Sequence, residues 1–233
     1  MLFGSSQKTK KAGDLKLSMH GEILGSVKKF KYLGLIFDTN LHWNKHINKI
    51  VSKVSQKAGV MKRLSKYISP STLKTLYNTL VQPHFDYCCA IWTNTSDKHV
   101  NRLQVMQNKI RRIILGCKIR EIHVKDMYKK LHLMSIRERA TYYKATMMYR
   151  CLNNKAPSYL IKSVKSNFCS HTYATRAKTA NKLNNGKVNT EFGKRTFEYT
   201  SSTLWNTLPS EVRNASNLNI FKTEVKTFIC KTR

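Results

Sequence analysis

The first forty residues alternate between apolar and polar side chains, which is the pattern of half-buried β-strands. The extended runs that this pattern predicts are residues 1–4, 15–19, 23–27 and 32–37. His20-Gly21-Glu22 separates two of these runs and is typical of a tight turn. Because residues 1–4 look like the end of a strand, we expect further strand-forming sequence upstream of Met1.

From residue 41 onward the apolar residues recur at steps of three and four, which is the period of an amphipathic α-helix. The helices predicted on this basis are residues 43–67, 70–92, 97–117, 124–131, 135–152, 201–208 and 217–230. Ser69 and Pro70 suit the N-cap and the first position of the second helix, and Pro83 should kink or end that helix. Residues 153–200 predict an extended linker, with a short strand pair near residues 192–199.

These elements predict an α+β fold that is mainly α. We expect three parts: a β segment at residues 1–40, a helical domain at residues 41–152, and a linker with short helices at residues 153–233. Hydrophobic residues make up 41% of the chain, so we expect a sizeable core and not a disordered polar tail.

Positive charge is the outstanding feature of the composition. The chain has 43 lysines and arginines against 12 acidic residues, a formal net charge of +31. Such an excess of like charge opposes a compact state by self-repulsion, and the phosphate backbone of nucleic acid would relieve it. We therefore expect RNA, DNA or an RNA–DNA hybrid as the partner. A solvated basic surface and an anionic membrane surface are the alternatives.

The sequence favours an intracellular location, either nuclear or cytoplasmic. No apolar run is long enough to span a bilayer, and the N-terminus does not resemble a signal peptide. The 6 cysteines include no Cys-x-x-Cys pair, so we expect reduced thiols. The protein is thus predicted to be neither secreted nor membrane-bound.

Nucleotidyl transfer requires carboxylates close together to hold two divalent metal ions, yet no two of the 12 acidic residues are adjacent. Asp38 follows a predicted strand, and we expect it to cap the next helix or pair with a lysine. His42 and His46 have the spacing of zinc ligands without an evident third ligand, so we expect one of them to pack beside Trp43. We predict no catalytic residue, no metal site and no cofactor in this chain.

The best candidate site lies in the hairpin predicted near residue 30. Its proposed nucleic-acid-binding residues are Lys28, Lys29, Lys31, Tyr32 and Gly34. Lysines can neutralise phosphates, a tyrosine can stack on a base, and a glycine lets the backbone approach a ligand or accommodates a bulge. The alternative is that Tyr32 is a core residue of a buried strand.

The predicted helix 97–117 carries a second basic set. Its proposed nucleic-acid-binding residues are Arg102, Lys109, Arg111 and Arg112. Phosphate contacts from such a helix would position a duplex without reading its sequence. The alternative is an ordinary solvated basic face.

Several landmark segments occur in order along the chain. They are Phe30-Lys31-Tyr32-Leu33-Gly34-Leu35-Ile36-Phe37-Asp38, Leu41-His42-Trp43-Asn44-Lys45-His46-Ile47, Leu80-Val81-Gln82-Pro83-His84-Phe85-Asp86-Tyr87-Cys88, Ala156-Pro157-Ser158-Tyr159-Leu160, Leu204-Trp205-Asn206-Thr207-Leu208-Pro209 and Phe221-Lys222-Thr223-Glu224-Val225-Lys226. Together they resemble the C-terminal part of reverse transcriptases from non-long-terminal-repeat (LINE-type, jockey-like) retrotransposons, over about residues 14 to 230.

The resemblance implies that residues 1–40 are the end of a polymerase palm with a primer-grip-like hairpin, and that residues 41–152 form a thumb-like domain. It also implies that the catalytic aspartates precede these landmarks in the family. We therefore expect this chain alone to be inactive, and Mg²⁺ to be required only by the full-length enzyme.

Three hypotheses remain open. The first is a reverse transcriptase fragment that binds template–primer. The second is a non-enzymatic interaction or structural protein whose exposed palm edge pairs with a protein partner, its basic surface being incidental. The third is a gene fragment that never folds stably.

Overall fold

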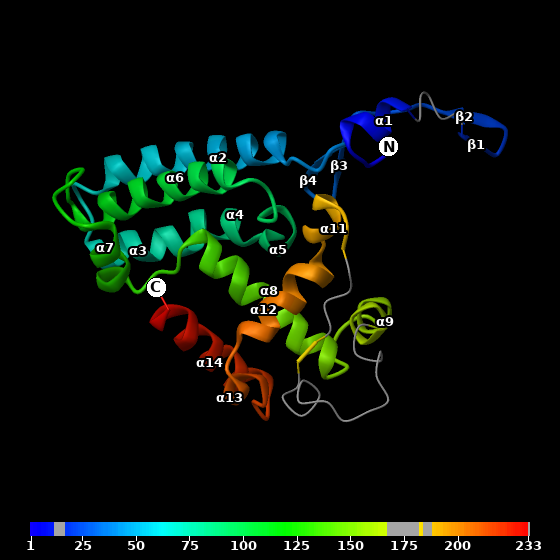
Figure 1. Ribbon diagram of the computed structural model, residues 1–233. Helices are drawn as coiled ribbons and strands as arrows, with labels where there is room; N and C mark the ends of the chain where they lie inside the picture. The colour runs from blue at the N-terminus through cyan, green and yellow to red at the C-terminus, as the bar shows by residue number, and fades with distance from the viewer. Residues whose placement is uncertain (12–16, 167–181, 184–187, 233) are drawn as a thin grey trace. The chain divides into compact units, whose positions relative to one another are not determined.

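The computed structural model describes residues 1–11, 17–166, 182–183 and 188–232 (Figure 1). The chain forms two compact units: Met1–Cys88 with Thr95–Leu133 is unit 1, and Cys89–Asn94 with Met134–Arg233 is unit 2. The described residues are mostly helical, with two small antiparallel hairpins, which confirms the α+β, mainly α class.

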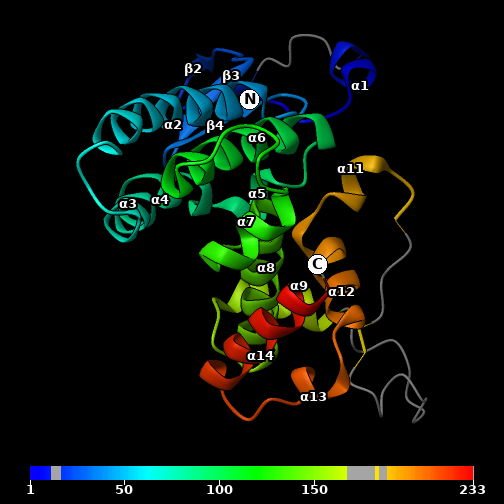
Figure 2. The same cartoon turned by 90° about the vertical axis from the view of Figure 1, so that its left-hand side faces the viewer.

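Unit 1 combines the hairpins with a helical part. Its elements are α1 (Ser6–Lys11), β1 (Leu17–Met19), β2 (Glu22–Leu24), β3 (Lys29–Tyr32), β4 (Leu35–Asp38), α2 (Asn44–Leu64), α3 (Pro70–Leu76), the π-helix η1 (Tyr77–Val81), α4 (Gln82–Asp86), α6 (Asp97–Leu115) and α7 (Val124–Leu131). Helices α2 and α6 lie side by side (Figures 1 and 2). The apolar stripes predicted for these two helices are buried: Ile47, Ile50, Val54, Ala58 and Met61 on α2, and Val100, Leu103, Ile110 and Ile114 on α6.

Both hairpins turn through two residues with positive φ. His20 and Gly21 join β1 to β2, and Leu33 (φ 43°) and Gly34 (φ 83°) join β3 to β4. Such turns match the right-handed twist of the paired strands. The turn predicted at His20-Gly21-Glu22 is confirmed for His20 and Gly21, whereas Glu22 already belongs to β2. The single strand predicted at residues 32–37 is wrong because Leu33-Gly34 divides it. Leu15, which was expected in the strand at residues 15–19, lies outside the described residues.

Residues 1–4 are not in a strand, so that expectation is wrong. The backbone N–H of Gly4 donates to the carbonyl oxygen of Thr39 at 3.0 Å, and helix α1 then begins at Ser6. One backbone hydrogen bond followed by a helix does not form the repeating ladder of a sheet.

The predicted second helix is divided by a π-helix and a break. Ser69 caps it as expected, with its Oγ accepting a hydrogen bond from Thr72 N at 3.2 Å. Pro83 has no N–H to donate and its ring crowds the carbonyl four residues earlier, and the π-helix η1 precedes it with wider turns. Cys88 then takes φ 52°, so the chain leaves the helix before Cys89.

Unit 2 is built on one long helix. Its elements are α5 (Cys89–Trp92), α8 (Ile136–Leu152), α9 (Ser158–Ser166), α11 (Glu191–Lys194), α12 (Phe197–Thr207), α13 (Ser210–Arg213) and α14 (Leu218–Lys231). A capping box starts α8, in which Ser135 and Glu138 exchange side-chain and backbone hydrogen bonds. Helix α14 packs along α8 (Figure 2). The ring of Phe221 stacks between those of Tyr149 and Trp205, with centroids 4.3 and 5.7 Å away.

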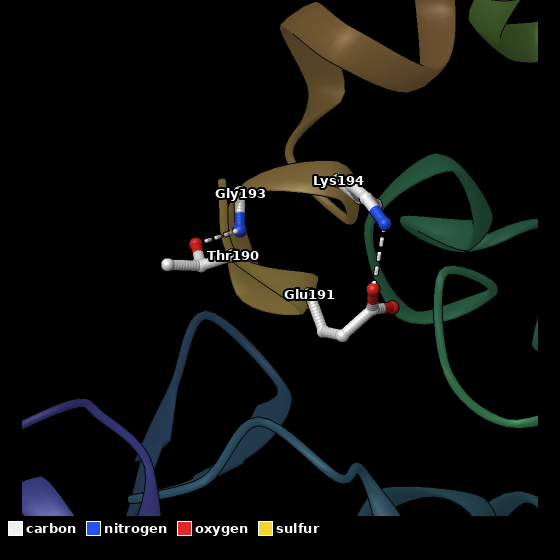
Figure 3. Close-up of polar contacts among 4 residues, drawn as sticks. All are labelled: Thr190, Glu191, Gly193 and Lys194. Carbon is white, nitrogen blue, oxygen red and sulfur yellow. Dashed lines mark hydrogen bonds and ion pairs between the residues drawn. The ribbon is translucent and has the colours of Figure 1, made fainter. Parts of the chain in front are cut away.

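The strand pair predicted near residues 192–199 is wrong, because helices α11 and α12 occupy this segment. Thr190 Oγ1 accepts from Gly193 N at 3.1 Å, and Lys194 pairs with Glu191 at 2.8 Å (Figure 3). Threonine caps favour helix starts over strands, and Thr196 caps α12 in the same way. The linker predicted from residue 153 also contains a helix, α9; residues 167–181 and 184–187 of that linker lie outside the described residues.

Candidate nucleic-acid interface

The β3–β4 hairpin is held to the helical part of unit 1 through its turn. The Tyr87 hydroxyl donates a hydrogen bond to the carbonyl oxygen of Leu33. A Cβ at Gly34 would lie 3.4 Å from Tyr87 Cε1, in addition to the strain of its positive φ. That distance is ordinary van der Waals contact, so the positive φ of the turn, and not the tyrosine ring, favours glycine here.

Strand β3 presents its predicted site residues to solvent. Lys28, Lys29, Lys31 and Tyr32 are all exposed, Tyr32 to 58%. Leu35 on β4 is buried and anchors the hairpin. The alternative of Tyr32 as a core residue is wrong, and its ring is free to meet a flat ligand.

Asp38 connects the hairpin to helix α2. Its two carboxylate oxygens accept hydrogen bonds from the backbone N–H groups of His42 and Trp43 at 2.9 and 2.8 Å. These N–H groups belong to the loop residue His42 and to the N-cap residue Trp43, and no side chain caps the first turn of α2. The expected helix cap by Asp38 therefore does not form, and the carboxylate instead holds the loop that leads into the helix. In the part of the chain that the structure describes, no group of three or more histidine, cysteine, aspartate or glutamate residues could hold a metal ion.

His46 lies inside unit 1 as a neutral side chain. Its ring packs edge-on to Trp43 at 6.2 Å, as expected, and its Nδ1 accepts a hydrogen bond from Ile36 N at 3.5 Å. Burial and then the positive charge of Lys49 lower the pKa of the imidazole from 6.5 to about 4. Protonation of His46 would thus oppose the docking of β4 on α2.

We expect unit 1 to lose stability as the pH falls from 6.5 towards 4. The pKa of His46 is lower in the folded than in the unfolded state, so its stabilising contribution is complete above the unfolded value and is lost as protons bind. At pH 5 the loss relative to pH 7 is about 2 kcal/mol, at about 1.36 kcal/mol per pKa unit. Urea unfolding at both pH values measures it. His46→Gln should flatten this dependence, and an equal dependence in the variant would contradict the assignment.

A line of lysines continues from the hairpin along α2. We call Lys31, Lys49, Lys53 and Lys57 the lysine row. Burial, and then the charges of Lys31 and Lys53, lower the pKa of Lys49. The pKa of His84 on α4 is lowered by partial burial and then by Lys57 and Lys53. These electrostatic effects indicate that Lys31 and Lys53 lie close to Lys49, and that Lys53 and Lys57 both lie close to His84.

The lysine row lacks local compensation. None of its members forms an ion pair with a carboxylate among the described residues. Lys49, Lys53 and Lys57 follow one another at four-residue steps, about 6 Å apart along the helix axis. A polyanion laid along α2 would replace their repulsion by attraction.

The cations of α6 lie on a different flank of α2. Arg102 Nη1 donates to Asn48 Oδ1 at 2.9 Å, and Ser55 faces Met106, so this flank of α2 meets α6. Lys53 and Lys57 lie instead towards His84 on α4. The structure therefore joins Lys31 of the hairpin to α2, and not to the predicted residues of α6.

Arg111 differs from the other predicted residues of α6 because it is fully buried. Its guanidinium lies 3.8 Å from the centroid of the Tyr128 ring, and Nη1 donates to Asn108 Oδ1 at 3.3 Å. Lys109 is exposed and Arg112 is half-buried. In this fold Arg111 joins α6 to α7 and does not reach a ligand on the surface of unit 1.

The four-residue spacing of Lys49, Lys53 and Lys57 was visible in the sequence, within a helix that was correctly predicted. That spacing alone does not distinguish a functional row from a solvated face. The additional signal is the proximity of Lys31, which depends on the docking of the hairpin.

Part of the chain is similar in sequence to a transposon protein. Over 91 residues, or 37% of this chain, it is 35% identical to the probable RNA-directed DNA polymerase from transposon X-element of Drosophila melanogaster. This match supports a relationship to non-LTR retrotransposon reverse transcriptases over that stretch. The chain spans about a tenth of that protein's length. No protein-family model and no solved structure matches the chain.

Among the described helices, none combines the length and the apolar character that crossing a membrane demands.

Proposed function

We propose that this chain is a fragment of a retrotransposon RNA-directed DNA polymerase, and that its own activity is to bind the backbone of a template–primer duplex. The observation that carries the proposal is the lysine row, four uncompensated cations that run from the hairpin onto α2. The match to a transposon polymerase and the net charge of +31 support it. Binding of this kind depends on salt and little on sequence.

In this proposal the hairpin acts as a primer grip at the end of the palm, and the helices of unit 1 act as a thumb. Lys28, Lys29 and Lys31 contact phosphates while Tyr32 meets a base or a sugar. Arg102, Lys109 and Arg112 on α6 offer further phosphate contacts apart from the lysine row. Polymerisation, with its Mg²⁺ ions, then requires carboxylates from another part of the enzyme.

Replacing Lys49, Lys53 and Lys57 with glutamine should weaken binding to a labelled RNA–DNA hybrid and flatten its salt dependence. If each lysine neutralises one phosphate, the slope of log K against log salt falls by about 2 to 3. Fluorescence anisotropy over a salt series measures both effects.

The matched control replaces Lys125, Lys129 and Lys130 on α7 with glutamine, which removes the same charge from exposed positions elsewhere in unit 1. An equal loss of slope in both triple variants would show that only total charge matters. That result would contradict the proposed site.

A specific observation favours protein binding as a second candidate function. The β1–β2 hairpin exposes apolar side chains on both faces, including Leu17 (56%), Met19 (59%) and Ile23 (75%). Exposed apolar hairpins are covered by partners in many proteins. A defined oligomer in gel filtration without nucleic acid, together with unchanged hybrid binding in the α2 variant, would favour this candidate.

A further inference from the structure

Unit 2 carries a basic and aromatic groove that has no part in the function proposed above. Two hollows, of about 320 and 600 Å³, share the lining residues Tyr142 and Lys222 and therefore adjoin each other. The first lies between α8 and α14, and the second follows α14 towards its C-terminus. We call them together the α8–α14 groove; the two helices that form it lie together in Figure 2.

The charge of the groove is of one sign. Arg150 lines the first hollow, Lys226 and Lys231 line the second, and Lys222 lines both, whereas no acidic residue is among the described residues lining either. Lys222 and Lys226 are one helical turn apart, about 6 Å along α14. Charge complementarity therefore requires an anionic occupant with more than one charge.

The aromatic residues that line the groove indicate which kind of anionic ligand fits it. Tyr142 is half-buried between the two hollows, and its ring lies edge-on to that of Tyr143 at 5.4 Å. Tyrosine rings next to cations suit a ligand that offers both a flat ring and phosphates. An acidic peptide offers only the charge. A duplex keeps its bases stacked inside, where a tyrosine in a groove cannot reach their faces.

We propose that the α8–α14 groove binds single-stranded nucleic acid, with a base stacked on Tyr142 and successive phosphates on Lys222 and Lys226. Arg150 and Lys231 extend the phosphate track at its two ends. The site is separate in residues and in ligand from the lysine row of unit 1. Each can therefore fail without the other.

The test compares oligothymidylate with an RNA–DNA hybrid on the full chain. Tyr142→Leu and the double variant Lys222→Gln/Lys226→Gln should each weaken oligothymidylate binding about tenfold. The double variant should also lower its salt slope by about 1.4, because each phosphate on a single strand contributes about 0.7. Hybrid binding should change less than about twofold, since it depends on unit 1.

The matched control is Lys155→Gln/Lys162→Gln, which removes the same charge from exposed positions of unit 2 outside the groove. An equal loss in this control would overturn the proposal. So would tight binding of polyglutamate that Tyr142→Leu leaves unchanged, because the groove would then be an acidic-peptide site.

A second measurement needs no variant and so does not depend on the folding of Tyr142→Leu. Cys230 is exposed and lines the groove, whereas Cys117 is half-buried in unit 1. Bound oligothymidylate should slow the alkylation of Cys230 severalfold relative to Cys117, as read by mass spectrometry. Unchanged alkylation of Cys230 under saturating oligothymidylate would overturn the proposal.

Discussion

Replacing Arg111 with alanine is expected to lower the free energy of unfolding by about 3 kcal/mol. The side chain is fully buried, and its guanidinium lies 3.8 Å from the centre of the Tyr128 ring. Truncation would leave a cavity between α6 and α7 and remove a desolvated cation–π contact. Urea unfolding followed by circular dichroism measures the change.

Two further variants distinguish the contribution of packing to stability from that of the charge at Arg111. Burying a guanidinium costs free energy that its removal returns, so Arg111→Met, which keeps much of the volume, should lose less than about 1.5 kcal/mol. Lys109→Ala on the exposed face of the same helix should change stability by less than about 0.5 kcal/mol. If Arg111→Ala instead leaves the unfolding midpoint unchanged and weakens hybrid binding, the side chain acts at the surface and this account of it is wrong.

Replacing Phe221 with alanine should cost about 4 kcal/mol of stability in unit 2. Phe221 is fully buried, and its ring stacks between Tyr149 and Trp205. The substitution therefore removes a large apolar area and two aromatic contacts, each worth about 0.5 to 1.5 kcal/mol. Thermal and urea unfolding of the full chain both report the loss.

Two control variants show how much of the stability loss in Phe221→Ala comes from the buried ring. Phe221→Leu should cost about 1 to 2 kcal/mol, because it keeps most of the buried apolar area. Tyr159→Ala removes a ring of comparable size that is 69% exposed, and it should change little. Equal losses from Phe221→Ala and Tyr159→Ala would show that the aromatic stack does not form the core of unit 2.

Packing explains several of the landmark segments in physical terms. Trp205 and Phe221 come from different landmarks and stack on each other. Asn206 accepts a hydrogen bond from the backbone N–H of Leu183 and donates one to its carbonyl, both at 2.8 Å. Tyr87 and Gly34 also come from different landmarks and meet at the β3–β4 turn. These residues therefore have structural contacts within each unit.

The helices of unit 1 could be predicted from the sequence because they depend on interactions between residues that are close together in the chain. The three- and four-residue spacing places Ile47, Val54 and Met61 on one face of α2, and all three are buried. Ser69 caps α3 through a hydrogen bond to a residue close to it in the chain, and Asp38 holds the loop before α2 in the same local way. The same local logic, applied to the threonines at residues 190 and 196, would have predicted α11 and α12 in place of a strand pair.

Whether each basic residue is buried or exposed does not depend on its neighbours in the sequence. Arg111 and Lys109 are two positions apart on one helix, yet Arg111 is enclosed by Tyr128, a residue 17 positions later, and Lys109 faces solvent. Likewise, Lys31 extends the row on α2 only because the hairpin docks there, and α5 joins unit 2 although unit 1 surrounds it in sequence. The order of residues thus defined the net charge, the helical faces and their caps. Tertiary packing chose which cations are buried and which lie in a row, because those outcomes depend on contacts between residues far apart in the chain.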